Sequence, residues 1–165
     1  MIYLLFAVCI FSLDLFFKKQ IETKEDTTFP IHLKGGITLE KHHNHGFIFN
    51  RLDQHPKLVR VVSCLTALPL IIWVFWLFTK KDTAITDSPP VAGPIGKLGA
   101  AFLLGGAASN LYDRLFRGYV VDYLRFRCRA LPRGLKKIRN IIFNIADFFI
   151  FAGGLLTTVY HFFIK

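Results

Sequence analysis

The sequence lacks much of what a soluble enzyme or a disulfide-rich secreted domain contains. Only 19% of its 165 residues are charged, and acids are scarce, with 11 Asp and Glu against 21 Lys and Arg. Its three cysteines, Cys9, Cys64 and Cys128, are odd in number and widely spaced, which predicts unpaired thiols and not a disulfide framework. It has neither an internal repeat nor a low-complexity segment. We therefore expect one domain over residues 1–165.

Apolar residues make up most of what is present, because 53% of the chain is hydrophobic and 15% is aromatic. They gather in four long runs, at residues 2–17, 58–79, 95–116 and 141–164. Runs of this kind predict transmembrane helices, so the expected fold is an all-α membrane protein with four spans. The first run follows Met1 without a basic segment, and no small-residue cleavage site follows it, which predicts a retained anchor.

The polar segment between the first two runs predicts a small β-structure. Within residues 27–41, apolar and polar residues alternate on both sides of Gly35 and Gly36, which can adopt the positive φ of a tight turn. We expect a β-hairpin or cradle over about 27–49, with one apolar face packed on the membrane surface or on the helix ends. Of the three histidines that follow, His43 and His45 would share a face of a strand and His42 would point away. Because no cysteine or paired carboxylate completes a site, we expect no metal here.

The net charge of +10 predicts an anionic partner. The basic residues flank the apolar runs, and no zinc-finger, RNP-like or helix-turn-helix pattern is present, so lipid headgroups fit better than nucleic acid. Most Lys and Arg lie in residues 18–60 or 114–139. By the positive-inside rule alone, the hairpin and the aspartates described next would face the cytoplasm.

The third and fourth runs bring carboxylates to the edge of the membrane. The third is rich in Gly and Ala, which let helices approach closely, and we expect it to be the most buried span. Gly118 should end that helix and leave Asp122 just outside it. Asp147 lies in the first turn of the fourth span, and we expect it to meet Asp122 at one membrane depth. Two helical faces supply the neighbouring polar groups: Asn110, Asp113 and Arg114 on the third span, and Asn144 and Asp147 on the fourth.

Two carboxylates in close, poorly solvated contact share a proton, so one can activate water while the other protonates a leaving amide. The sequence offers no Ser/His or Cys/His arrangement as a competing nucleophile. Taken separately, Asp122 could be an ordinary loop acid, and Asp147 could be a helix acid favoured by the dipole. Asp113 beside Arg114 should stay ionised and hold the frame.

A further acid and base lie near the end of the first run. Asp14 and Lys18 are four residues apart and share a helix face. Asp14 and Lys18 form either an ion pair at the membrane interface or part of the surroundings of the active site. Because the first run is short for a spanning helix, Lys18 and Lys19 would extend toward the headgroups.

Several short motifs together resemble the lipoprotein signal peptidase (signal peptidase II) family. They are Asn110-Leu-Tyr-Asp113-Arg114, Gly118-Tyr-Val-Val-Asp122-Tyr123, Phe143-Asn144-Ile-Ala-Asp147, the Asp14/Lys18 pair, and Asn44-x-Gly46. They occur in the expected order and span residues 14–147.

The resemblance implies a membrane aspartyl endopeptidase with a β-cradle at the outer face of the bacterial cytoplasmic membrane. It would cleave prolipoproteins before a diacylglyceryl-modified cysteine, without a metal or organic cofactor, and we expect a monomer among membrane lipids. Carried over by position, Asp122 and Asp147 are catalytic. The support positions are Asn44, Gly46, Asn110, Arg114 and Asn144, and the structural ones are Asp14, Lys18 and Asp113.

The sequence departs from the family pattern at Phe47, Ser109 and Phe148, and its basic loop, residues 125–139, is long. A bulky Phe148 would narrow the site or desolvate Asp147. These departures keep two alternatives open: a divergent member with an altered substrate, and a non-enzymatic membrane scaffold whose acids are structural.

Overall fold

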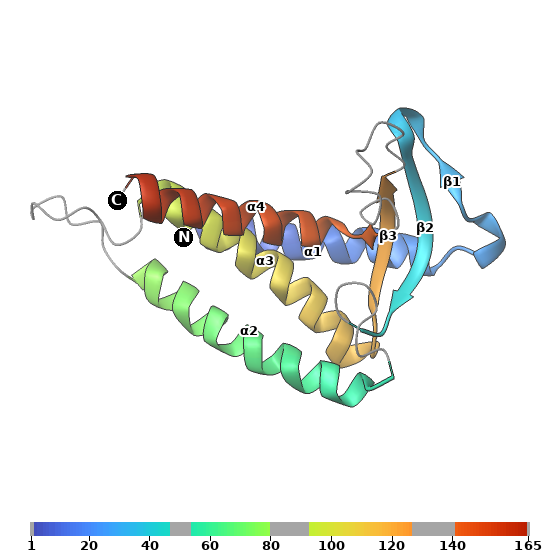
Figure 1. Ribbon diagram of the computed structural model, residues 1–165, viewed down its shortest axis with the longest axis horizontal. Helices are drawn as coiled ribbons and strands as arrows, with labels where there is room; N and C mark the ends of the chain where they lie inside the picture. Colours follow the sequence, from blue (N-terminus) through green and yellow to red (C-terminus); the bar gives the residue numbers. More distant parts are fainter. Residues whose placement is uncertain (1, 47–53, 80–92, 127–140, 165) are drawn as a thin grey trace, which may run out of the picture.

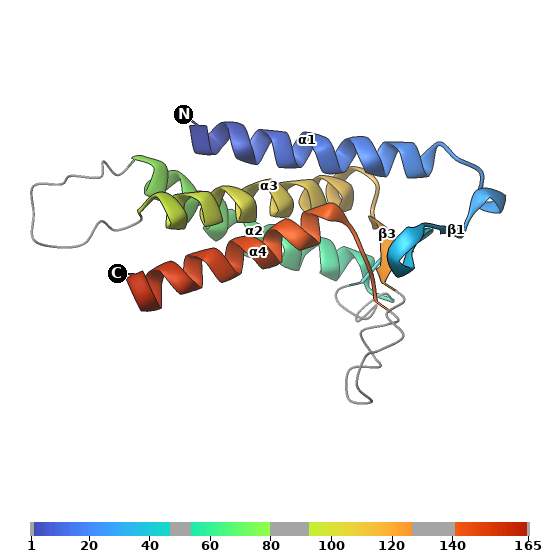
Figure 2. The same cartoon turned by 90° about the horizontal axis from the view of Figure 1, so that it is seen from above.

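The computed structural model describes residues 2–46, 54–79, 93–126 and 141–164. Four long helices run beside one another, and a small sheet lies across one end of them (Figure 1). The helices are α1 (Ile2–Glu22), α2 (Pro56–Thr79), α3 (Pro94–Phe116) and α4 (Ile145–Val159), and a π-helical turn, Tyr160–Ile164, extends α4. The chain begins and ends at the end of the bundle remote from the sheet (Figure 2).

The sheet has four antiparallel strands in chain order. They are β1 (Ile31–His32), β2 (Ile37–Asn44), β3 (Val120–Phe126) and β4 (Ile142–Phe143). A short 3-10 turn, η1 (Asp26–Thr28), precedes β1, and another, η2 (Lys34–Gly36), joins β1 to β2. Gly35 and Gly36 there have φ of 80° and 78°, so the predicted hairpin is confirmed.

Half of the sheet was not predicted from the sequence. β3 follows Gly118, which ends α3 with a φ of 86° as expected, but the chain then forms a strand instead of an irregular turn. The register places Asp122 opposite His42 and Val120 opposite Asn44. The hairpin therefore does not stand alone, because it extends into a sheet that reaches the start of α4. The alternation of apolar residues in the hairpin predicts one buried face, and this is only partly correct. Leu39 packs in a core cluster, but Leu33 is 46% exposed.

Helix α3 is the centre of the bundle, as its small residues predicted, and it contacts α1, α2 and α4. A Cβ added at Gly106 would lie 2.5 Å from the carbonyl oxygen of Ala146, so glycine is what lets α3 approach the first turn of α4. Helix α2 packs on α3 mainly through Val74, Leu77 and Ala100, at the end far from the sheet.

Within the described residues, two helices are long and apolar enough to cross a membrane by length and composition, Pro56–Thr79 and Ile145–Phe163. Only 22% and 17% of their most apolar stretches are buried, unlike the core helix of a soluble protein. Helix α1 does not meet the same criterion, because Asp14, Lys18 and Lys19 interrupt its apolar sequence; it continues past the predicted boundary at residue 17 to Glu22. Helix α3 is diluted by glycines and carries Asn110, Asp113 and Arg114 near its end.

Candidate functional site

Asp122 lies in the middle of β3 and is 2% exposed. Two amide groups from separate elements donate to its carboxylate: Asn44 Nδ2 to Oδ2 at 3.0 Å, and Asn144 Nδ2 to Oδ1 at 2.8 Å. Burial, and after it the negative charge of Asp147, raise the pKa of Asp122 from its ordinary value to about 7. Asp122 is thus a buried residue of a strand and not an ordinary loop acid.

Asp147 occupies the third position of α4 and takes part in a capping box. Its backbone N–H donates to Asn144 Oδ1 at 2.9 Å, and its own Oδ2 accepts from the backbone N–H of Asn144 at 3.2 Å. Its Oδ1 accepts from Asn110 Nδ2 at 2.8 Å. Asp147 therefore is the helix-start acid that the sequence suggested, but its second oxygen is also held by a side chain of α3.

Asn110 and Asn144 connect the two carboxylates. Besides donating to Asp122, Asn144 Nδ2 lies 3.1 Å from Asn110 Oδ1, while the amide nitrogen of Asn110 donates to Asp147. The order Asp122–Asn144–Asn110–Asp147 is thus a continuous chain of hydrogen bonds. Because each amide is fixed at both ends, both carboxylates are held in defined orientations.

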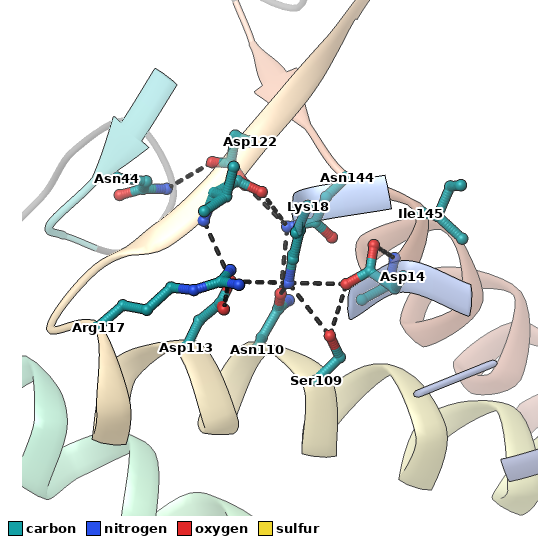
Figure 3. A network of polar contacts seen from close by, with 12 residues as sticks. Asp14, Lys18, Asn44, Ser109, Asn110, Asp113, Arg117, Asp122, Asn144 and Ile145 are labelled. Carbon is teal, nitrogen blue, oxygen red and sulfur yellow. Dashed lines mark hydrogen bonds and ion pairs between the residues drawn. The ribbon is translucent and has the colours of Figure 1, made fainter. Parts of the chain in front are cut away.

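The buried ammonium group of Lys18 lies next to this chain of hydrogen bonds and contacts Asn110 (Figure 3). Lys18 Nζ is 2.7 Å from Asp14, 2.9 Å from Asp113 and 2.9 Å from Asn110 Oδ1, and the side chains of all three charged residues are 0% exposed. Ser109 Oγ is a fourth acceptor at 3.2 Å. Lys18 therefore neither extends to the headgroups nor forms an interfacial ion pair with Asp14, and the second alternative, a role beside the site, is the correct one.

The predicted pairing of Asp113 with Arg114 is wrong. Asp113 pairs with Arg117 at 2.7 Å and accepts from the backbone N–H of Val121 at 3.2 Å. Arg114 donates instead to the backbone carbonyl of Gly46 at 2.8 Å. The physical reason is that the two side chains leave α3 about 100° apart, so the i+4 residue Arg117 lies on the face of Asp113 and Arg114 does not.

Both aspartates line one cavity of about 620 Å³. Its polar lining consists largely of residues that the sequence predicts to be catalytic or supporting, namely Asn44, Asn110, Arg114, Asp122 and Asp147. Its other walls are mainly apolar and come from α2, α3, β4 and α4, including Ala67, Leu70, Phe143, Ile150 and Phe151. A cavity with a polar end and apolar walls suits an amphipathic ligand.

The remaining sequence expectations have mixed outcomes. Phe148 is 60% exposed and does not line this cavity, so the expected narrowing of the site is wrong. His43 and His45 both contact the ring of Tyr119, as residues on one face should, and His43 also pairs with Glu22 at 2.7 Å. Phe47 and most of the basic loop lie outside the described residues. Within the described part of that loop, Arg125 pairs with Glu40 at 2.8 Å.

Sequence reasoning missed two members of the buried network. Ser109 was treated only as a departure from a pattern, yet its hydroxyl donates to Asp14 at 2.6 Å. The motif that contains Tyr123 assigns it no role, yet its hydroxyl donates to the same carboxylate at 3.1 Å. The available signal was the presence of hydroxyl groups beside Asn110 and Asp122, in segments otherwise apolar.

Comparisons with known proteins agree with this geometry. A family model described as signal peptidase (SPase) II matches residues 6–163. The lipoprotein signal peptidase of Caldicellulosiruptor bescii is 31% identical over 159 residues, which cover 96% of this chain and 89% of that protein. The lipoprotein signal peptidase of Francisella tularensis subsp. novicida is 28% identical over 126 residues, 75% of this chain and 73% of that protein.

Two solved structures share the fold. Both are described as bacterial membrane enzymes determined by the in meso method, at 2.3 Å and 1.9 Å resolution. Each has a TM-score of 0.72, and their sequence identities to this chain are 21% and 20%. The first match covers 96% of this chain and 86% of the solved chain, and the second covers 99% and 94%.

Proposed function

We propose, because this chain belongs to the signal peptidase II family, that Asp122 and Asp147 are its catalytic pair. The family is one of aspartic endopeptidases, and the chain is an enzyme of that type. The observation that carries the proposal is the placement of the two carboxylates at the polar end of one cavity, joined through Asn144 and Asn110.

In the proposed reaction the pair holds one proton. Asp147 accepts a proton from a water molecule, which attacks the scissile carbonyl carbon, and Asp122 donates its proton to the leaving amide nitrogen. The raised pKa of Asp122, about 7, supports its role as the protonated partner at neutral pH. Asp147 suits the role of base because the N-terminus of α4 and two N–H donors stabilise a negative charge there.

The proposed substrate is a prolipoprotein that carries a diacylglyceryl-modified cysteine. The polar end of the cavity would hold the peptide, with Arg114 and the Gly46 carbonyl beside it. The apolar walls from α2 and α4 would contact the lipid part. This division supports the proposal because the acyl chains can stay in a hydrocarbon environment while water reaches the aspartates.

Cleavage of a diacylglyceryl-modified prolipoprotein peptide in detergent micelles tests the mechanism. We expect Asp122→Asn and Asp147→Asn each to abolish cleavage while remaining folded. Asp26→Asn is the matched control, because the side chain of Asp26 is 87% exposed in η1. Unchanged cleavage by both site variants would refute the aspartyl mechanism. If the unaltered protein cleaves none of several such substrates, the divergent-member and scaffold alternatives take its place.

We also propose that all four helices span the bacterial cytoplasmic membrane, with the sheet at the outer face. Large apolar side chains are exposed along the helices, which supports contact with lipid; examples are Leu5, Phe6, Leu65, Phe75 and Phe151. The distribution of Lys and Arg predicts the reverse orientation, so a direct test is needed.

Single cysteines introduced into a variant without the three native ones provide that test. We expect Asp26→Cys, beside the sheet, to react with a membrane-impermeant maleimide in intact cells. His161→Cys, at the opposite end of α4, should react only after lysis. The opposite labelling pattern would place the aspartates on the cytoplasmic side.

A further inference from the structure

The phenolic hydroxyl of Tyr123 lies between the two segments that carry the aspartates. Tyr123 directly follows Asp122 on β3 and is 2% exposed. Its hydroxyl donates to Asp14 Oδ1 at 3.1 Å and accepts from the backbone N–H of Ile145 at 3.3 Å. Ile145 is the first residue of α4, two positions before Asp147. One hydroxyl thus joins the strand of one aspartate to the helix of the other.

Asp14 makes the same connection from the other side. Its Oδ1 accepts from the backbone N–H of Ala146 at 3.2 Å as well as from Tyr123. Its Oδ2 is fixed by Lys18 at 2.7 Å and by the Ser109 hydroxyl at 2.6 Å, both fully buried. The carboxylate that accepts from Tyr123 is therefore fixed through its other oxygen by Lys18 of α1 and Ser109 of α3, so it holds β3 and α4 in a defined relative position.

Packing alone does not account for this hydroxyl. The ring of Tyr123 packs with Ile21 and Val121 and stacks on Phe17 with a centroid distance of 6.4 Å, contacts that a phenylalanine ring would make equally well. A buried hydroxyl must be matched by hydrogen-bonding partners, and here each partner is tied to the site. Burial and the charge of Asp14 raise the pKa of Tyr123 above its ordinary value, so the hydroxyl keeps its proton and donates.

We infer that Tyr123 is a positioning residue, whose hydroxyl sets the separation of Asp122 and Asp147 through Asp14 and the start of α4. It does not line the cavity, so it acts on the carboxylates and not on the substrate. This inference rests on the proposed catalytic role of the two aspartates.

Tyr123→Phe tests it, because the substitution removes the hydroxyl and keeps the ring. We expect kcat to fall roughly tenfold or more, as a small misplacement of reacting groups does, with KM within about twofold of the unaltered enzyme. The charge of Asp147 would act less strongly on Asp122 once the pair can separate, while Lys18 still lowers the pKa of Asp122. The upper limb of the kcat–pH profile should therefore move to lower pH. Tyr119→Phe is the matched control, since it removes a hydroxyl bonded to Glu22, outside the site.

Ile145→Pro breaks the same link from the helix side. Proline suits the first position of a helix, as Pro94 shows in α3, and Asn144 before it has the extended φ of −122° that proline requires. It removes the N–H that donates to Tyr123 and leaves the tyrosine in place. We expect the same fall in kcat and the same shift of the profile, in a smaller amount.

A folded Tyr123→Phe variant with the kcat and pH profile of the unaltered enzyme would overturn the inference. So would a loss of thermal stability with an unchanged profile, because that is what a merely structural hydroxyl produces. If Tyr123→Phe does not fold, Ile145→Pro decides alone, by the same criteria. Failure of the proposed function is a separate result, seen as cleavage retained in Asp122→Asn or Asp147→Asn, or as no cleavage by the unaltered protein.

Discussion

Replacing Lys18 with methionine should destabilise this protein strongly, because it leaves buried carboxylates without their cation. Methionine keeps an unbranched chain close to the four-carbon stem of lysine, with sulfur in place of one methylene, and lacks the ammonium group. Asp14 and Asp113 would remain fully buried. Among the described ion pairs, Asp113 would keep Arg117 as a partner, whereas Asp14 would keep none. Breaking a buried ion pair by removing one partner typically costs about 3–5 kcal/mol. Asn110 would also lose one of the two donors to its Oδ1, which hold its amide in the orientation that reaches Asp147; the other donor is Asn144.

Thermal unfolding in detergent micelles at a fixed scan rate measures this loss. For a chain of this length, the expected destabilisation corresponds to a fall in the unfolding midpoint of roughly 10 °C. Cleavage should be lost as well, because the orientation of Asn110 holds one oxygen of Asp147. Adding Asp14→Asn to Lys18→Met should restore part of the stability, since Asp14 is the carboxylate left without a cation among the described ion pairs.

Lys41→Met is the matched control. Lys41 also pairs with an aspartate, Asp26, at 2.8 Å, but the side chain of Asp26 is 87% exposed and water screens the pair. We expect this variant to unfold close to the temperature of the unaltered protein. If Lys18→Met and Lys41→Met unfold at the same temperature, the buried network does not stabilise the fold, and the reasoning from burial fails.

Two further predictions concern pH and helix packing. Cleavage should decline as pH rises through about 7, because Asp122 then loses the proton that it donates. Thermal stability should decline as well. The raised pKa of Asp122 means that its neutral form stabilises the folded state, and this contribution to stability is complete below the ordinary pKa of 3.8 and lost above about 7. A kcat–pH profile flat from 6 to 9 would contradict this. Gly153→Ala should cost about 1–3 kcal/mol by overpacking, because its Cβ would lie 2.6 Å from the Gly99 carbonyl. Gly154→Ala is the control: its added Cβ would have no atom within 4 Å, so the free energy of unfolding should be unchanged or rise by up to about 1 kcal/mol through helix propensity. Equal unfolding midpoints for the two variants would contradict the close approach of α3 and α4.

The sequence predicted the elements whose signals are local. Long apolar runs indicated four helices, and the alternation around Gly35 and Gly36 indicated the hairpin. Gly118 was correctly placed at the end of a helix, because a residue with positive φ there favours glycine. The i, i+3 spacing of Asn144 and Asp147 corresponds to a capping box, which is likewise a local structure.

Signals that depend on partners distant in sequence were misinterpreted. The sequence predicts only that the chain leaves the helix after Gly118, and not the strand β3. This segment forms a strand by pairing with β2, and Asn44 and Asp122, which are in contact, are 78 residues apart in sequence. Asp113 was assigned to its sequence neighbour, whereas its partners are Arg117 and the distant Lys18. Phe148 was placed in the site because it follows Asp147, although consecutive residues of a helix point in different directions.

By itself, the sequence determined which residue types could perform the chemistry and which helices carry them. Asp122 and Asp147 were recognisable because a carboxylate beside an apolar run is costly and must be held by other groups. The tertiary structure alone decided what holds them: the amide chain through Asn144 and Asn110, and the buried contacts of Lys18 behind it. Such contacts join α1, α3, β3 and α4 across separations of 22 to 132 residues, and no local periodicity encodes them.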